Sequence, residues 1–164
     1  MNPLSLGGIA VALAIVLANF KPWWKGGRDP KALVPFGTGA ALGALATICA
    51  GGALGWGASG VASLISGAGD KAVTSVTGTG SAPVATASLG ALTPPGGVVV
   101  FLLTIGVVLM WKSAGKDDKR RTAGGLITGA TLGILPGVAA GLAVLPDAVN
   151  WIGAQGYGLL GGAA

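Results

Sequence analysis

The sequence contains no histidine and no glutamate, and it has a single cysteine, Cys49. A lone cysteine cannot form an internal disulfide. No group of Asp, Cys, His or Glu residues has the spacing of a metal site, and no base accompanies a serine or cysteine nucleophile. The glycine-rich stretches lie in apolar runs and do not form a phosphate-binding loop. The sequence therefore predicts a protein that is not an enzyme and that needs no metal or cofactor.

Charge is also scarce. Only 9% of the 164 residues are charged, against 52% hydrophobic residues and a mean hydropathy of +0.77. An ordinary soluble domain carries roughly 25% charged residues. The 32 glycines have no collagen-like period and lie mostly in apolar runs. These features predict that a lipid bilayer is the natural surrounding of the chain.

Most of the charge is gathered in two short clusters, each next to tryptophan. The basic residues are Lys21, Lys25, Arg28 and Lys31 in the first cluster, and Lys112, Lys116, Lys119, Arg120 and Arg121 in the second. A nucleic-acid partner would require a continuous cationic face, which two separate short clusters do not provide. We interpret both clusters as cytoplasmic turns of a multi-pass membrane protein, with both termini and the 67–95 segment on the outside.

Four apolar stretches accompany these turns, and we expect each to be a membrane-spanning helix: 4–20, 36–56, 97–111 and 123–145. Pro136 is expected to bend the last of them. Residues 67–95 are rich in Ser, Thr and Gly and predict an external loop, with a short extended element near 73–77. The tryptophans are expected at the membrane interfaces: Trp23, Trp24, Trp56, Trp111 and Trp151. The expected fold is all-α.

Glycine recurs at every fourth residue in two of these stretches. The first series is Gly39, Gly43, Gly51 and Gly55, with Thr47 at the middle step, and the second is Gly125, Gly129, Gly133, Gly137 and Gly141. Such stripes allow two helix backbones to approach closely in a membrane, with a right-handed crossing near −40°. The contact can form within one chain or between copies, and the sequence does not decide between the two arrangements.

The order of features is repeated along the chain. Each half contains an apolar helix, a Trp-Lys pair, a basic turn and a glycine-striped helix, and the segment 38–43 matches 128–133. We therefore divide the chain into a first hairpin with an interfacial tail (1–66), the external loop (67–95) and a second hairpin with its tail (96–164). An even number of helices in each half predicts that both halves insert in the same direction.

Each half, with its basic turn at 21–31 or 112–121 and the stripe that follows, resembles the hairpin of conjugative (type IV secretion) pilins. That resemblance implies a subunit stored in the bacterial inner membrane that polymerises with bound phospholipid into an extracellular filament. The tandem hairpins also resemble the duplicated proteolipid of rotary ATPases, but this sequence lacks the carboxylate which that family holds within the membrane.

These observations predict a self-associating structural or pore-forming membrane subunit, encoded by a bacterial mobile element. Two alternatives remain open: a phage-type holin that permeabilises the inner membrane, and an accessory subunit that binds other members of a larger membrane complex.

Overall fold

The computed structural model describes residues 4–49 and 51–161, and its fold is all-α, as expected. The helices are α1 (Leu6–Lys25), the 3₁₀ helix η1 (Pro30–Leu33), α2 (Val34–Ala46), α3 (Ala53–Thr77), α4 (Pro94–Ser113), α5 (Lys116–Leu132), α6 (Pro136–Leu142) and α7 (Val144–Gly161). Two short strands, β1 (Leu4–Ser5) and β2 (Pro83–Val84), form an antiparallel pair.

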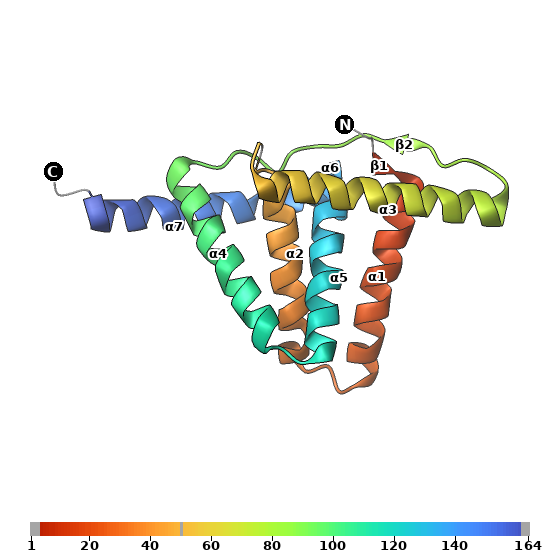
Figure 1. Cartoon of the computed structure of the whole chain (residues 1–164), viewed down its shortest axis with the longest axis horizontal. Helices are drawn as coiled ribbons and strands as arrows, with labels where there is room; N and C mark the ends of the chain where they lie inside the picture. The colour runs from red at the N-terminus through yellow and green to blue at the C-terminus, as the bar shows by residue number, and fades with distance from the viewer. Residues whose placement is uncertain (1–3, 50, 162–164) are drawn as a thin grey trace.

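Helices α1, α2, α4 and α5 run side by side, whereas α3 and α7 lie across one end of them (Figure 1). We call α3 and α7 the platform. The opposite end, where α1 and α4 finish and α2 and α5 begin, is called the basic end. Apolar side chains fill the region where α2, α4 and α7 meet, around Leu45, Val100 and Val149. The outline of the molecule is broad at the platform and narrow at the basic end (Figure 1).

The expected helix over 36–56 is wrong in its second half. Helix α2 ends at Ala46, and the chain reverses at Gly51, whose φ of 78° is one that side-chain-bearing residues rarely adopt. Helix α3 then leaves across the end of the bundle. Gly51 therefore lies in a turn and Gly55 lies in the platform helix α3, so neither belongs to α2.

The expected loop over 67–95 is also wrong in its first part. Helix α3 continues to Thr77, where Gly78 ends it in the left-handed conformation with φ of 72°. The extended element expected near 73–77 is helical. The buried residues of α3 are small and recur at helical spacing: Ala58, Ala62, Ser66 and Gly69. Ala58 packs against Ala46 of α2 and Ala130 of α5, whereas Ser66 and Gly69 lie against Gly7 and Gly8 at the start of α1. The irregular connection with its short strand begins only after Gly78.

The glycine-striped helix expected over 123–145 is interrupted. Helix α5 ends at Leu132, and Pro136 begins α6 instead of bending a continuous helix. Leu135 has an extended ψ of 135°, the conformation that a following proline favours. The interfacial tail expected at the end of the 96–164 segment is helical as far as Gly161, and this helix, α7, crosses the end of α4 (Figure 1).

The helical prediction for the valine-rich stretch 97–111 is confirmed, since α4 covers it despite its β-branched residues. Among the described residues, three stretches are long and apolar enough to cross a membrane: Leu6–Lys25, Pro94–Ser113 and Pro136–Gly161. The third comprises α6 and α7. Figure 1 shows α7 lying across the end of the bundle, so α1 and α4 are the two of these apolar stretches that run along it.

Candidate functional site

The centre of the molecule is a contact between the backbones of α2 and α5. A Cβ atom placed on Gly39 would overlap the carbonyl oxygen of Thr122 and lie 3.0 Å from the Leu126 nitrogen. A Cβ atom on Gly125 would overlap the carbonyl oxygen of Phe36 and lie 2.9 Å from the Ala40 nitrogen. The two contacts are equivalent: each glycine meets the carbonyl three residues before the facing glycine and the nitrogen one residue after it.

The next turn repeats this arrangement. A Cβ atom on Gly43 would overlap the Leu126 carbonyl oxygen, and one on Gly129 would overlap that of Ala40. Gly39 therefore corresponds to Gly125, and Gly43 to Gly129. The sequence match of 38–43 with 128–133 is displaced from this correspondence by four residues. Glycine recurs at every fourth residue, so the glycines of the two stripes still coincide after a shift of four residues. The sequence match therefore does not determine which glycines face each other in the structure.

The remaining stripe glycines behave differently from one another. Gly133 ends α5 and lies near Ala44, whose Cα would be 3.3 Å from an added Cβ. Gly55 packs against the Cys49 carbonyl in the turn before α3. Gly137 and Gly141 face open space on α6. The structure thus brings Gly39, Gly43, Gly125, Gly129 and Gly133 to the α2–α5 contact and leaves the other stripe glycines outside it.

A second set of glycine contacts was not predicted from the sequence. Gly7 of α1 meets the backbone of Gly69 of α3, and Gly153 of α7 meets the backbone at Pro95 and Gly96 of α4. In the sequence, both contacts lie next to a capping residue that precedes a glycine by three positions. Ser5 Oγ accepts a hydrogen bond from the Gly8 N–H at 3.1 Å, and Thr93 Oγ1 accepts one from the Gly96 N–H at 3.2 Å.

Asn150 fastens α7 to the start of α4. Its Oδ1 accepts hydrogen bonds from the Thr93 N–H at 2.9 Å and from the Thr93 hydroxyl at 3.1 Å. Its Nδ2 donates to the Ala91 carbonyl at 3.0 Å. One amide side chain therefore holds the last residues of the connecting segment against the platform.

We expect Asn150→Ala to loosen this junction and to lower the free energy of unfolding by about 1–2 kcal/mol, because the backbone amide of Thr93 loses its acceptor. Hydrogen–deuterium exchange of the peptide containing Thr93 should become faster. Gln155→Ala changes an exposed amide on the same helix and is the matched control. Equal exchange in the two variants would contradict the assigned role of Asn150.

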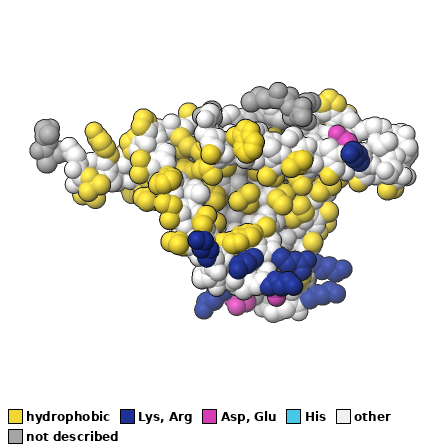
Figure 2. Space-filling model, in the orientation of Figure 1, with side chains coloured by type: hydrophobic (Ala, Val, Ile, Leu, Met, Phe, Trp, Pro, Cys, Tyr) yellow, Lys and Arg dark blue, Asp and Glu magenta, His cyan; other side chains and the backbone are white. Residues whose placement is uncertain are grey.

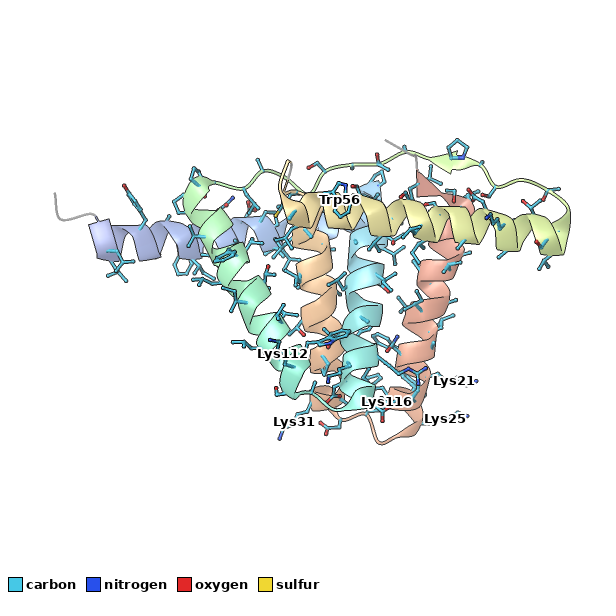
Figure 3. All side chains as sticks on the ribbon, viewed as in Figure 1. Lys21, Lys25, Lys31, Trp56, Lys112 and Lys116 are labelled. Carbon is cyan, nitrogen blue, oxygen red and sulfur yellow. The ribbon has the colours of Figure 1, made fainter. Side chains whose placement is uncertain are left out.

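The predicted basic residues gather at the end opposite the platform (Figures 2 and 3). In contrast to the expected turn over 112–121, Lys112 lies in the last turn of α4 and the residues from Lys116 onward belong to α5. Asp117 and Asp118 occupy the first turn of α5, where negative charge is favourable to the helix dipole. Arg28 lies over the Trp24 ring, 4.1 Å from its centroid.

Arg121 connects the two halves at the basic end. Its Nη1 donates a hydrogen bond of 2.6 Å to the carbonyl of Ala32, which belongs to η1. Arg120, the preceding residue, is exposed. The two neighbouring arginines therefore contribute the same charge but different contacts.

We expect Arg121→Gln to lower the free energy of unfolding by about 1–2 kcal/mol, since a charge-assisted hydrogen bond is lost. Arg120→Gln removes the same charge without this bond and should leave stability nearly unchanged. Denaturant unfolding of both variants in one detergent, followed by helical circular dichroism, makes the comparison. A similar loss in both variants would show that only the charge matters.

The tryptophans lie at two levels. Trp23, Trp24 and Trp111 are near the basic end of α1 and α4, and the Trp23 indole N–H donates to the Asp29 carbonyl at 2.8 Å. Trp56 and Trp151 belong to the platform, and Trp56 is 80% exposed (Figure 3). Trp56 therefore does not end a spanning helix, as 36–56 had implied.

Within the part of the chain that the structure describes, no cluster of three or more His, Cys, Asp or Glu side chains could hold a metal ion. Comparison with protein-family models, curated proteins and solved structures finds no match.

Proposed function

We propose that the protein is a non-enzymatic, multi-pass membrane subunit that self-associates and has a structural role. In this proposal α1, α2, α4 and α5 form a four-helix unit of two tandem hairpins, joined at the α2–α5 glycines. The platform lies in the outer interface of the membrane, and the basic end lies in the cytoplasm.

The observation that carries this proposal is the apolar outer surface between the two ends. The side chains of Leu17 on α1 and Phe101 and Leu109 on α4 are 68%, 62% and 60% exposed. Figure 2 shows apolar side chains over this middle region, with the basic residues below it. A soluble monomer rarely exposes so continuous an apolar surface, which needs lipid or another protein surface to cover it.

The glycine contacts favour assembly through the outer faces of α1 and α4. Gly39, Gly43, Gly125 and Gly129 are occupied within the chain, so they do not offer a free stripe to another copy. Gly106 of α4 faces open space. Close approach of a second copy is therefore compatible with α4.

A structural role is better supported than a pore-forming role. A water-filled pore needs polar groups along its wall, whereas the exposed positions of α1 and α4 named above are apolar. The Thr104 hydroxyl of α4 is already used, because it donates to the Val100 carbonyl at 2.8 Å. The resemblance of each half to conjugative pilins is compatible with storage in a bacterial inner membrane before assembly into a filament.

The mass of the protein extracted in mild detergent tests self-association, by light scattering together with electron microscopy of the same fraction. Uniform rings or filaments are expected. A monomer that copurifies with other proteins would overturn the proposal in favour of an accessory subunit. Membrane leakage and cell death on expression, without ordered assemblies, would favour a holin.

Cysteine cross-linking locates the interface. On a Cys49→Ser background, a cysteine replacing exposed Ile105 on α4 is expected to cross-link between copies in membranes. A cysteine replacing Ala130, which is 1% exposed, is the control and should not cross-link. Cross-linking at neither position would place the interface elsewhere.

A further inference from the structure

A polar hollow lies where the start of α1, the platform and the β1–β2 pair meet. It measures about 370 Å³ and is lined by Ser5, Ser63, Ser66, Gly67, Asp70, Ser81 and Pro83. Three separate segments of the chain thus contribute to it. Figure 1 shows β1, the start of α1 and α3 at the end of the molecule opposite the basic end, and the lining residues place the hollow at that end.

Asp70 is the charged group in the lining. The Ser5 hydroxyl, and then that of Ser81, hold the pKa of Asp70 below its ordinary value, so the carboxylate is charged at neutral pH. The Ser81 hydroxyl donates a hydrogen bond to this carboxylate. Among the described lining residues there is no lysine or arginine to neutralise it.

Serine side chains surround this carboxylate. Ser5, Ser63 and Ser81 line the hollow together with Asp70. The Ser66 hydroxyl is instead buried between α3 and α1, 2.8 Å from the position that a Cβ atom on Gly8 would take. A serine oxygen that donates its own proton can still accept hydrogen bonds. The hollow therefore combines a negative charge with several hydroxyl acceptors.

We propose that this hollow binds the primary ammonium group of an ethanolamine phospholipid headgroup. The inference rests on the proposed function, because it requires the platform to lie at the level of the lipid headgroups. A primary ammonium group has three N–H donors, which one carboxylate and neighbouring serine oxygens can accept.

The lining distinguishes this ligand from other cations and headgroups. The volume lies in the range of sites for small organic groups and exceeds what a bare ion requires. A quaternary ammonium is typically held by aromatic rings, and the lining has none. An anionic headgroup without an amine would be repelled by Asp70. Ethanolamine lipid should therefore bind in preference to choline or glycerol lipid.

Native mass spectrometry of the purified full-length protein tests this preference. The protein is delipidated in detergent and offered phosphatidylethanolamine, phosphatidylcholine and phosphatidylglycerol with identical acyl chains. We expect phosphatidylethanolamine to be retained about tenfold more than phosphatidylcholine, since a charge-assisted hydrogen bond distinguishes them. Asp70→Asn should abolish this preference, whereas Asp147→Asn, an exposed carboxylate on α7, should preserve it.

Ser63→Ala provides a second variant, because Asp70 also holds Ser81 in place. The Ser63 hydroxyl donates to the Gly60 carbonyl of its own helix, so this variant should fold normally. It should retain phosphatidylethanolamine several-fold less, because the hollow loses an acceptor. Equal retention of the ethanolamine and choline lipids by the wild-type protein would overturn the proposal, as would full retention by folded Asp70→Asn. Flotation with vesicles of phosphatidylcholine and phosphatidylglycerol tests the membrane location separately from the ethanolamine site. A protein that floats but shows no headgroup preference contradicts only the ethanolamine site.

Discussion

Gly39→Ala is expected to lower the free energy of unfolding by about 3 kcal/mol, the upper part of the range for adding a methyl group to a tightly packed core. The added carbon would overlap the backbone carbonyl of Thr122, which cannot move without separating α2 from α5. Gly37→Ala is the matched control, because Gly37 lies two residues earlier in α2 and faces open space. That variant should be unchanged or slightly more stable, since alanine favours the helix. Unfolding by sodium dodecyl sulfate in mixed micelles, followed by helical circular dichroism, gives both values.

The contact at Gly125 is the reciprocal of the contact at Gly39. Gly125→Ala should cost about as much as Gly39→Ala, because its added carbon meets the corresponding carbonyl, that of Phe36. The double variant should lose less than the total of the two single losses, since one substitution already separates the helices. Strict additivity, or a loss in Gly37→Ala equal to that in Gly39→Ala, would contradict the paired contact.

Reversing the charge of the second basic cluster is expected to disturb the membrane orientation proposed above for α4 and α5. The triple variant Lys116→Glu, Lys119→Glu and Arg120→Glu replaces three cations but keeps Arg121 and its bond to Ala32. Basic residues in short loops oppose translocation across the membrane. Their replacement should place the start of α5 on the outer side in a large share of the molecules.

Labelling with a membrane-impermeant maleimide measures this orientation. Single cysteines at Gly80 in the connecting segment and at Gly115 before α5 are introduced on a Cys49→Ser background. In the wild-type sequence only the cysteine at 80 should react in intact spheroplasts, whereas in the triple variant the cysteine at 115 should react too. Arginine at positions 116 and 119, with Arg120 retained, keeps the charge and is the control. Unchanged protection of the cysteine at 115 in the triple variant would refute the assigned orientation.

The sequence predicted the α-helical class and glycine positions that lie at the α2–α5 contact, but it did not predict where these helices end. Glycine has two uses that look identical in a sequence. At Gly39 it allows two backbones to touch, whereas at Gly51 it permits a positive φ in a turn. The four-residue spacing continues through both positions, so the sequence predicts a helix that is longer than α2, which ends at Ala46.

Helix α3 was missed for a related reason. Its Ser, Thr and Gly content is typical of a loop, yet Ala58, Ala62, Ser66 and Gly69 occupy the buried face. Small residues suit this face because it lies closely on three other helices: Ala58 packs against α2 and α5, and Gly69 meets the backbone of α1. Which helix would lie there depends on tertiary packing, and local composition does not contain that information.

The polar hollow could not be predicted either. Ser5, Asp70 and Ser81 come from different segments, and none belongs to a recognisable motif. They meet because Gly7 and Gly69 allow α3 to lie against the start of α1 and because β1 pairs with β2. Without the contact between these glycines, the three side chains would be unrelated residues of a serine-rich chain.

The broad platform and the narrow basic end also have a mechanical consequence. In the bilayer arrangement proposed above, the platform helices displace lipid area from the outer leaflet, while the tapered end displaces less from the inner one (Figure 1). A bilayer crowded with such wedges relieves the difference by bulging toward the platform side. Copies packed side by side would then form an arc instead of a flat raft, with its radius set by the angle at which α4 leans away from α2 and α5.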